Sequence, residues 1–269
     1  MSRFPSVSLR SRLMMVVILA VLPALIVTFY SGLRQRQRAL ADTRATALAL
    51  ARDLSDAQEE IVGNTHRILV TLAQLPQVIR RDPEASTAVL ARLLRLSEGS
   101  TNIVACDSAG QVFANVIPLI QPISYSDREW FQRVLQTHSF VISDFLIGRI
   151  NGKPEVILAN PVVDDSGHLQ GVLHTALRID WLNRFIAKRN LPQGVTGSVI
   201  DRNGTVLAHY PHPEQFIGKS AAEIPVVKRV LDEIEGVAEL PGLNGEAYVF
   251  GYASLRKVPG SMHTVVGTP

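Results

Sequence analysis

The sequence contains only one cysteine, Cys106, among its 269 residues. A single cysteine excludes an internal disulfide, a redox pair and a zinc site built from several cysteines. The sequence also lacks a phosphate-binding loop, a G-x-S-x-G elbow around a nucleophilic serine, an H-E-x-x-H helix and a paired set of catalytic carboxylates. No catalytic constellation is therefore present in this chain, and we expect neither a cofactor nor a bound metal.

A strong charge of one sign is also missing. The formal net charge is +3, with 19% charged and 46% hydrophobic residues, which is ordinary for a folded protein. Much of the positive excess comes from arginines that flank one apolar segment near the N-terminus. These arginines indicate membrane flanks, so we expect no nucleic-acid partner.

The apolar segment runs from Leu13 to Leu33 and contains no charged residue. Its length is about the 20 residues that an α-helix needs to cross the hydrocarbon core of a bilayer. A cleavable signal peptide has a shorter apolar core and a small-x-small cleavage site, of which Pro23-Ala24 is a poor example. We therefore predict an uncleaved transmembrane helix over residues 13–33.

The charge rule leaves the orientation of this helix open, because three arginines lie on each side of it. They are Arg3, Arg10, Arg12, Arg34, Arg36 and Arg38. No second apolar run of spanning length follows in the sequence. We expect residues 1–12 in the cytoplasm, a single pass through the inner membrane, and the rest of the chain in the periplasm.

Apolar residues then recur at heptad spacing, which predicts one long stalk helix over residues 34–75. The repeat comprises Leu33, Leu40, Ala47, Leu54, Ile61, Ile68 and Leu75. Polar Thr43, Asn64 and Thr71 occupy the second coiled-coil position, so the pattern does not specify a continuous zipper. Gly63-Asn64 is a candidate break. The expected partner of the stalk is a second copy of the chain, in a homodimer.

The stretch from Ser124 to Pro161 has the most distinct local pattern. Ser126 with Glu129 forms a capping-box pattern that predicts a helix from about Asp127. One side of this helix is apolar, with Trp130, Phe131, Val134 and Leu135. Two strand-like runs follow, Phe140 to Ile142 and Val156 to Ala159, and between them lies the Asn151-Gly152 pair of a tight turn. We expect a helix laid over a hairpin.

Three turns share the pattern D-x-x-G, at Asp107, Asp164 and Asp201. The first and third lie within similar runs, CDSAGQVFAN and IDRNGTVLAH. This internal repeat implies two related modules, which we place at residues 76–190 and 191–269. Further predicted helices start at Asp82-Pro83 or span Asp180 to Arg189 and Ala221 to Glu235, and closing strands span Ala247 to Ser254 and Met262 to Val266.

The run DREWFQRVL, followed by SDFLIGRINGKPEVILANPVVDDSGHLQGVLHTALRIDWL, closely resembles the double Cache sensor domain of bacterial transmembrane receptors. TGSVIDRNGTVLAHYPHPEQFIGKS is similar to the second half of that family. The resemblance implies an α+β fold of two PAS-like modules, each with a central antiparallel sheet. It also implies small-molecule binding in the membrane-distal module and a cytoplasmic output, such as a histidine kinase, a diguanylate cyclase or a chemotaxis module. No output domain is present, so we expect an input region truncated before a second transmembrane helix.

The branch of this family that binds amino acids has an Arg, a Trp and an aromatic residue that match Arg128, Trp130 and Phe131. Its later Tyr and two Asp residues are replaced here by Leu146, Gly148 and Ala176, which offer no acceptor for an ammonium group. We therefore predict an organic anion as the ligand. The expected ligand-binding residues are Arg128, Trp130, Phe131, Phe145, Arg149 and His174. For Trp130 and Phe131, packing in the core is an equally good interpretation.

Two other classes of protein stay open. An anchored hydrolase would use His174 or His209 with a nearby Asp, and an assembly protein would use the stalk for oligomerisation. His209 and His212 have a spacing seen in metal sites, but Pro211 and Pro213 favour a surface loop instead.

Overall fold

The computed structural model describes residues 9–95, 99–189, 191–241 and 247–269, with side chains from residue 30 onward except residues 32, 33 and 36. The chain forms two compact units, Met1–Ala45 and Thr46–Pro269. Helix α1 spans Leu9–Ala73 and is continuous through Gly63, so the expected break is absent. No helix among the described residues is long and apolar enough to cross a membrane, and most side chains of the expected span 13–33 lie outside the described part.

The first sheet contains the predicted strands around the D-x-x-G turns and the hairpin. Its strands are β1 (Ser100–Asp107), β2 (Val112–Asn115), β3 (Val141–Ile142), β4 (Leu146–Ile147), β5 (Pro154–Val163) and β6 (Leu169–Arg178). Their order is β2-β1-β6-β5-β3, with β4 also paired to β5, and every pairing is antiparallel.

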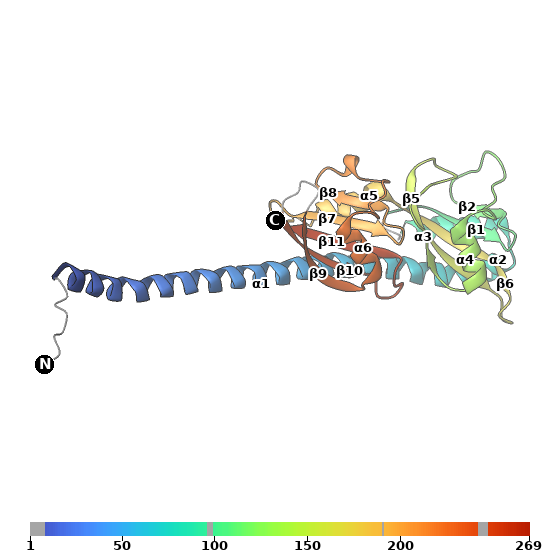
Figure 1. Ribbon diagram of the computed structural model, residues 1–269. Helices are drawn as coiled ribbons and strands as arrows, with labels where there is room; N and C mark the ends of the chain where they lie inside the picture. Colours follow the sequence, from blue (N-terminus) through green and yellow to red (C-terminus); the bar gives the residue numbers. More distant parts are fainter. Residues whose placement is uncertain (1–8, 96–98, 190, 242–246) are drawn as a thin grey trace. The chain divides into compact units, whose positions relative to one another are not determined.

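The second sheet repeats this arrangement with five strands (Figure 1). They are β7 (Thr196–Asp201), β8 (Val206–Tyr210), β9 (Glu235–Pro241), β10 (Ala247–Ser254) and β11 (Met262–Thr268). The order is β8-β7-β11-β10-β9, again antiparallel throughout. In both sheets the last strand pairs with the first. An α+β fold with two antiparallel sheets is thus confirmed.

The D-x-x-G turns are built identically, which explains why the pattern recurs. Asp107 Oδ1 accepts hydrogen bonds from the backbone N–H groups two and four residues later, at 3.0 and 2.8 Å. Asp201 Oδ1 does the same at 2.9 and 2.8 Å. Gly110 and Gly204 have φ values of 83° and 76°, a left-handed conformation that favours glycine. Each turn therefore needs the Asp that accepts these hydrogen bonds and the Gly that adopts the left-handed conformation.

The remaining helices are short. They are α2 (Pro76–Ile79), α3 (Pro83–Leu94), α4 (Glu129–Thr137), α5 (Ile179–Ala187), the 3₁₀ helix η1 (Pro213–Gln215) and α6 (Pro225–Asp232). Asp82 caps α3 through its side chain, as predicted. The helix expected over residues 221–235 is shorter than predicted, and β9 follows it. Strand β9 lies at a sheet edge and has only one buried residue, so it lacks an apolar run that would have indicated it.

The predicted capping box at Ser126 is wrong. Helix α4 begins at Glu129, with Arg128 as N-cap and no side-chain cap. A turn precedes the helix instead, because the Tyr125 N–H donates to Gly110 O and the Arg128 N–H donates to Tyr125 O, both at 2.9 Å. Backbone bonds to the first D-x-x-G turn thus position the start of this helix.

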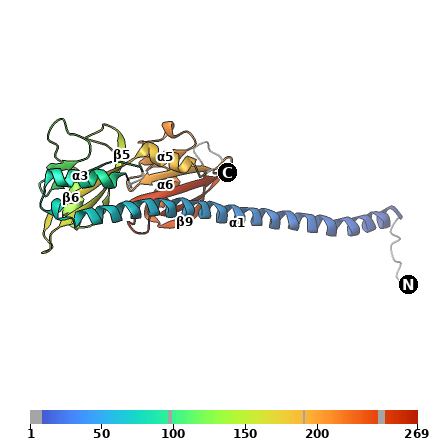
Figure 2. The same ribbon diagram turned by 180° about the vertical axis from the view of Figure 1, so that it is seen from behind.

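Each sheet is covered on both faces. One hydrophobic cluster joins α1, α3 and α5 to one face of both sheets, and it includes Leu54, Leu69 and Leu182. The opposite face of the first sheet packs against α4, and that of the second sheet packs against α6. Figure 2 shows α1 and α3 in front of the sheets, on the side away from α4 and α6. Three of the predicted ligand residues, Trp130, Phe131 and His174, lie between α4 and its sheet.

Candidate functional site

His174, on β6, is a buried polar side chain with no partner. It is 2% exposed, and neither of its ring nitrogens has a hydrogen-bond partner among the described residues. Burial lowers the pKa of this histidine to about 3, so the imidazole is neutral at physiological pH. A buried polar group without a partner costs about 1–3 kcal/mol. An unsatisfied buried polar group in a folded protein requires a specific explanation.

Aromatic rings enclose this imidazole. Tyr125 meets it edge-on at 4.8 Å between ring centroids, and Trp130 lies at 4.7 Å. Trp130 also contacts Phe131 at 6.0 Å. The alternation of β6 directs Val172, His174 and Ala176 toward α4, because side chains two residues apart share one face of a sheet. The structure therefore brings together three of the predicted residues, Trp130, Phe131 and His174, with Tyr125 added.

Arg128 lies at the edge of this cluster, as the N-cap of α4. Its guanidinium makes one long hydrogen bond, from Nη2 to Ile147 O at 3.4 Å. Its charge also acts on Glu155, where it opposes the effect of burial, which raises the pKa of that carboxyl. Arg128 therefore has donors left for an anionic ligand group.

Glu155 is a buried acceptor that the sequence analysis missed. It is 5% exposed and accepts a hydrogen bond from Asn151 Nδ2 at 2.8 Å. By strand alternation it shares the face of β5 that carries Ile157 and Ala159, and these pack beneath α4. A Cβ atom at Gly148 would lie 2.4 Å from Glu155 Oε1, so only glycine leaves room for this carboxyl group. The glycine at position 148 thus leaves space for the carboxylate of Glu155, an acceptor on strand β5.

Arg149 is already engaged in the structure. Its guanidinium donates twice to the Asp127 carboxylate, at 2.9 and 2.7 Å, and once to Ser124 O. The ion pair lowers the pKa of Asp127 to about 2. Arg149 also lies 5.8 Å from the centroid of the Tyr125 ring. It therefore holds the segment before α4 in place beside the cluster around His174.

Phe145 lies apart from His174, at the junction of the two modules. Its backbone N–H donates to Asp201 Oδ2 at 3.0 Å, and its ring approaches Gly218. Beside it, Arg202 pairs with Asp144 at 2.9 Å.

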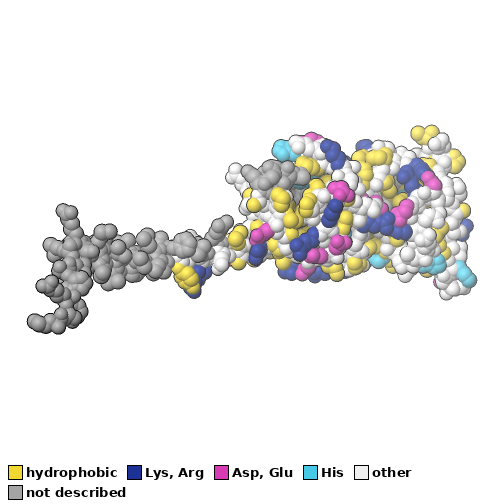
Figure 3. Space-filling model, viewed as in Figure 1, with side chains coloured by type: hydrophobic (Ala, Val, Ile, Leu, Met, Phe, Trp, Pro, Cys, Tyr) yellow, Lys and Arg dark blue, Asp and Glu magenta, His cyan; other side chains and the backbone are white. Residues whose placement is uncertain are grey.

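The same Arg202 also bonds to Glu129 at 2.8 Å, and Glu129 is the first residue of α4. Basic and acidic side chains are interspersed over the face seen in Figure 3. The junction thus connects the helix above His174 to the D-x-x-G turn of the second module.

Two signals in the sequence could have found the missing residues. Glu155 is a charged residue at an inward position of a strand, two residues before Ile157. Tyr125 lies three residues before Arg128, just outside the predicted helix, and was not considered as a site residue.

Two sheets of one strand order, packed along one helix, define a two-module α+β domain. A family model, dCache_1, described as a Cache domain, matches residues 33–269. The chain belongs to the Cache domain family, and the resemblance found in the sequence is confirmed. No curated protein matches the chain.

Solved structures share this fold at low sequence identity. The extracellular domain of the histidine kinase rpHK1S-Z16 has a TM-score of 0.75 and 16% identity, over 85% of this chain and 95% of that one. The ligand-binding domain of the Pseudomonas fluorescens chemoreceptor CtaA, in complex with L-isoleucine, gives 0.70 and 15%, over 87% and 95%. The periplasmic sensory domain of the Campylobacter jejuni chemoreceptor Tlp1 gives 0.67 and 12%, over 85% and 95%.

Proposed function

We propose that this chain is the extracytoplasmic sensing region of a membrane-anchored signal-transduction receptor, and that it binds a small molecule between α4 and the first sheet. The observation that carries the proposal is His174, which is buried against the rings of Tyr125 and Trp130 and whose two ring nitrogens have no hydrogen-bond partner among the described residues. A ligand that bonds to this imidazole removes the cost of its burial. Relatives of the same fold are sensor domains of histidine kinases and chemoreceptors.

The anchor in this proposal is the apolar segment 13–33, which crosses the inner membrane once and leaves the Cache domain in the periplasm. Two copies associate along α1, in agreement with the heptad spacing of its apolar residues. The receptor's output is a histidine kinase or a diguanylate cyclase. Ligand binding shifts the populations of two arrangements of α4 and the second module, because Arg202 and Asp201 join them.

The chemistry of the side chains around His174 favours a small carboxylate. Arg128 offers a forked donor, and the neutral His174 offers one donor and one acceptor. The absence of acceptors at positions 146, 148 and 176 suggests a ligand without an amino group. Glu155 supplies an acceptor nearby, however, so amino acids belong in the same test. The neighbouring chemoreceptor structure contains L-isoleucine, which makes an amino acid the natural competitor.

Calorimetric titration of the full chain in detergent with small dicarboxylates, hydroxy acids and amino acids tests the proposal. For the ligand that binds, we expect Arg128→Ala to weaken binding by about 2–4 kcal/mol, the range for losing one partner of a buried, hydrogen-bonded charge pair. Glu155→Gln separates the two ligand classes, since it weakens the binding of an amino acid and leaves that of a simple acid unchanged.

Arg92→Ala is the matched control, because Arg92 is exposed on α3. It should bind like the original chain. An Arg128→Ala chain with unchanged affinity for every ligand would contradict the assignment of the site.

A further inference from the structure

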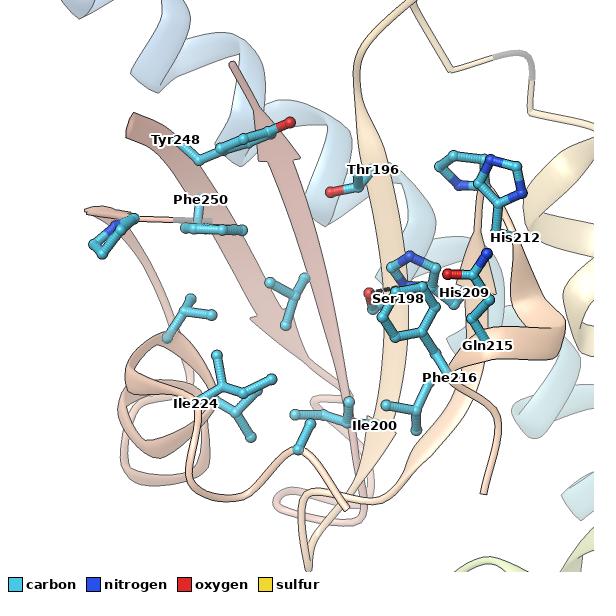
Figure 4. A pocket seen from close by; sticks show the side chains of 17 residues that line it. Thr196, Ser198, Ile200, His209, His212, Gln215, Phe216, Ile224, Tyr248 and Phe250 are labelled. Atoms are coloured by element: carbon cyan, nitrogen blue, oxygen red, sulfur yellow. Dashed lines mark hydrogen bonds between the residues drawn. The ribbon is translucent and has the colours of Figure 1, made fainter. Parts of the chain in front are cut away.

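The second module contains a cavity of about 280 Å³, separate from the cluster around His174 (Figure 4). We call it the proximal cavity. It lies between the second sheet and the segment that carries η1 and α6, and its lining includes Ala221, Ile224, Val226, Val227, Tyr248 and Phe250. The volume is close to the lower end of the usual range for small-molecule sites, about 300 Å³.

The backbone shows that this cavity is the counterpart of the proposed site around His174 under α4, which we call the distal site. The Ala221 N–H donates to Gly204 O at 2.8 Å, as the Tyr125 N–H donates to Gly110 O at 2.9 Å. Three residues later, the Ile224 N–H donates back to Ala221 O at 2.9 Å, and Ile224 is the N-cap of α6. Position 221 thus corresponds to Tyr125, and position 224 corresponds to Arg128.

Strand register extends the correspondence to the sheet. Cys106 pairs with Val172, and at the equivalent place Ile200 pairs with His263. Two residues farther along each last strand lie His174 and Val265, and Val265 lines the proximal cavity. The side chains that fill or charge the distal site are therefore small and apolar in the second module.

The proximal cavity also contains one hydrogen-bonding pair. Ser198 Oγ lies 2.8 Å from His209 Nδ1, and the His209 ring packs against Phe216 at 4.1 Å (Figure 4). Asn183 Oδ1 accepts from the His209 N–H at 2.9 Å and so fixes the backbone there. Burial lowers the pKa of His209 to about 4, which keeps the ring neutral at pH 7.

The lining excludes charged ligands and favours flat ones. None of the described lining residues is Asp, Glu, Lys or Arg, so nothing there compensates the desolvation of an ion. Tyr248 and Phe250 stack at 5.7 Å with an interplanar angle of 22° and form an aromatic wall. Exposed His212 and Gln215 also line the cavity, so it is reachable from solvent.

We propose that the proximal cavity is a second ligand site, which takes an uncharged aromatic molecule of one or two rings with a hydroxyl group that bonds to Ser198 or His209. The proposal does not depend on the distal site. It gives the chain two inputs of different chemistry, a polar one under α4 and an apolar one under α6.

Phenol is the probe, titrated calorimetrically into the full chain in detergent after subtraction of the heat from empty micelles. We expect saturable binding and its loss in Ala221→Tyr, since this change fills the cavity with the side chain that Tyr125 provides in the first module. Ser198→Ala leaves the volume of the cavity almost unchanged. It should weaken the binding of phenol by about three- to tenfold, which is the contribution of one neutral hydrogen bond. Ser139→Ala, in an exposed position of the first module, is the matched control and should change nothing.

Three outcomes would overturn the proposal. These are no saturable binding of phenol, unchanged binding in Ala221→Tyr at an unchanged melting temperature, and tighter binding of benzoate than of phenol. If Ala221→Tyr fails to fold, Ser198→Ala decides, and unchanged phenol affinity in that variant counts against the site. The distal site is titrated separately with carboxylates, so failure of one site is distinguishable from failure of the other.

Discussion

The two modules have one backbone plan and opposite interiors. In each, a D-x-x-G turn accepts a backbone hydrogen bond from the residue that leads into the covering helix, Tyr125 in the first module and Ala221 in the second. In the first module that residue is a buried aromatic ring against His174. In the second it is a methyl group at the wall of a cavity. One hydrogen-bonded frame thus supports either a packed polar cluster or an apolar hollow.

This difference shows which parts of the domain determine the fold and which determine its chemistry. The turns, the strand order and the helix starts are backbone features shared by both modules. The side chains above the sheet are free to differ, because they pack against a covering helix rather than into the frame. Function therefore depends on these side chains and does not follow from the fold.

The largest expected effect comes from truncating the packed interior. Trp130 is 2% exposed, and Trp130→Ala should lower the free energy of unfolding by about 3–5 kcal/mol, through lost burial and a new cavity. Val226 occupies the equivalent place beside a hollow, and Val226→Ala removes only two carbon atoms, which costs roughly 1–2 kcal/mol. Urea denaturation of the two variants measures both losses. Equal losses would contradict the contrast between the two interiors.

The pH dependence of stability gives the next largest effect. The folded-state pKa of His174 is lowered to about 3 from an ordinary value near 6.5, so the unfolded chain binds a proton more readily. The histidine therefore has little influence above pH 7. It destabilises the fold increasingly as the pH falls through 6.5 toward 3. Between pH 7 and pH 5 the loss should be roughly 2 kcal/mol.

Variants show which module causes the loss of stability on acidification. His174→Phe should remove its part of the acid sensitivity, and His209→Gln should remove a further part of similar size between pH 7 and pH 5, because both folded-state pKa values lie below 5. Denaturation midpoints at pH 7 and pH 5 provide the measurement. If His174→Phe kept the full loss on acidification, the imidazole would not be neutral and enclosed as described.

The junction between the modules should contribute less. Arg202 pairs with Asp144 and Glu129, and its side chain is 34% exposed, so solvent screens these bonds. Arg202→Gln should cost about 1 kcal/mol of stability. It should also increase hydrogen exchange at the start of α4 more than in α6, because Glu129 loses a partner. Equal exchange in both helices would indicate that the junction does not position α4.

Much of the fold was predictable from the sequence because its signals are local. The D-x-x-G turns, the cap at Asp82 and the apolar run in β5 depend on near neighbours in the chain. Phe145 was predicted as a ligand-binding residue, but its backbone N–H bonds to Asp201, which is 56 residues distant in sequence. Such a contact depends on how the modules pack, and no local pattern records it.

The site was predictable in its apolar part and less so in its polar part. Trp130 and Phe131 follow from helical spacing, whereas the ion pair of Arg149 with Asp127 joins residues 22 apart in the sequence and depends on how the chain folds back. The same reason explains the misplaced helix start. A capping box is a local pattern. Here the start of α4 is set instead by the backbone hydrogen bond from Tyr125 to Gly110, which is distant in the sequence.

The smallest expected effect tests whether backbone hydrogen bonds, rather than a side-chain cap, fix the start of α4. Neither α4 nor α6 has a side-chain cap, so Ser126→Ala should change the free energy of unfolding by less than about 0.5 kcal/mol. Asp82→Ala is the matched comparison, since its carboxylate accepts from the Ala85 N–H at 3.0 Å, and its loss should cost about 1 kcal/mol. Thermal and urea unfolding of both variants give the difference. A loss at Ser126 as large as that at Asp82 would mean that a side-chain cap, rather than the turn, starts α4, and the shared frame of the two modules would then lose one of its connections.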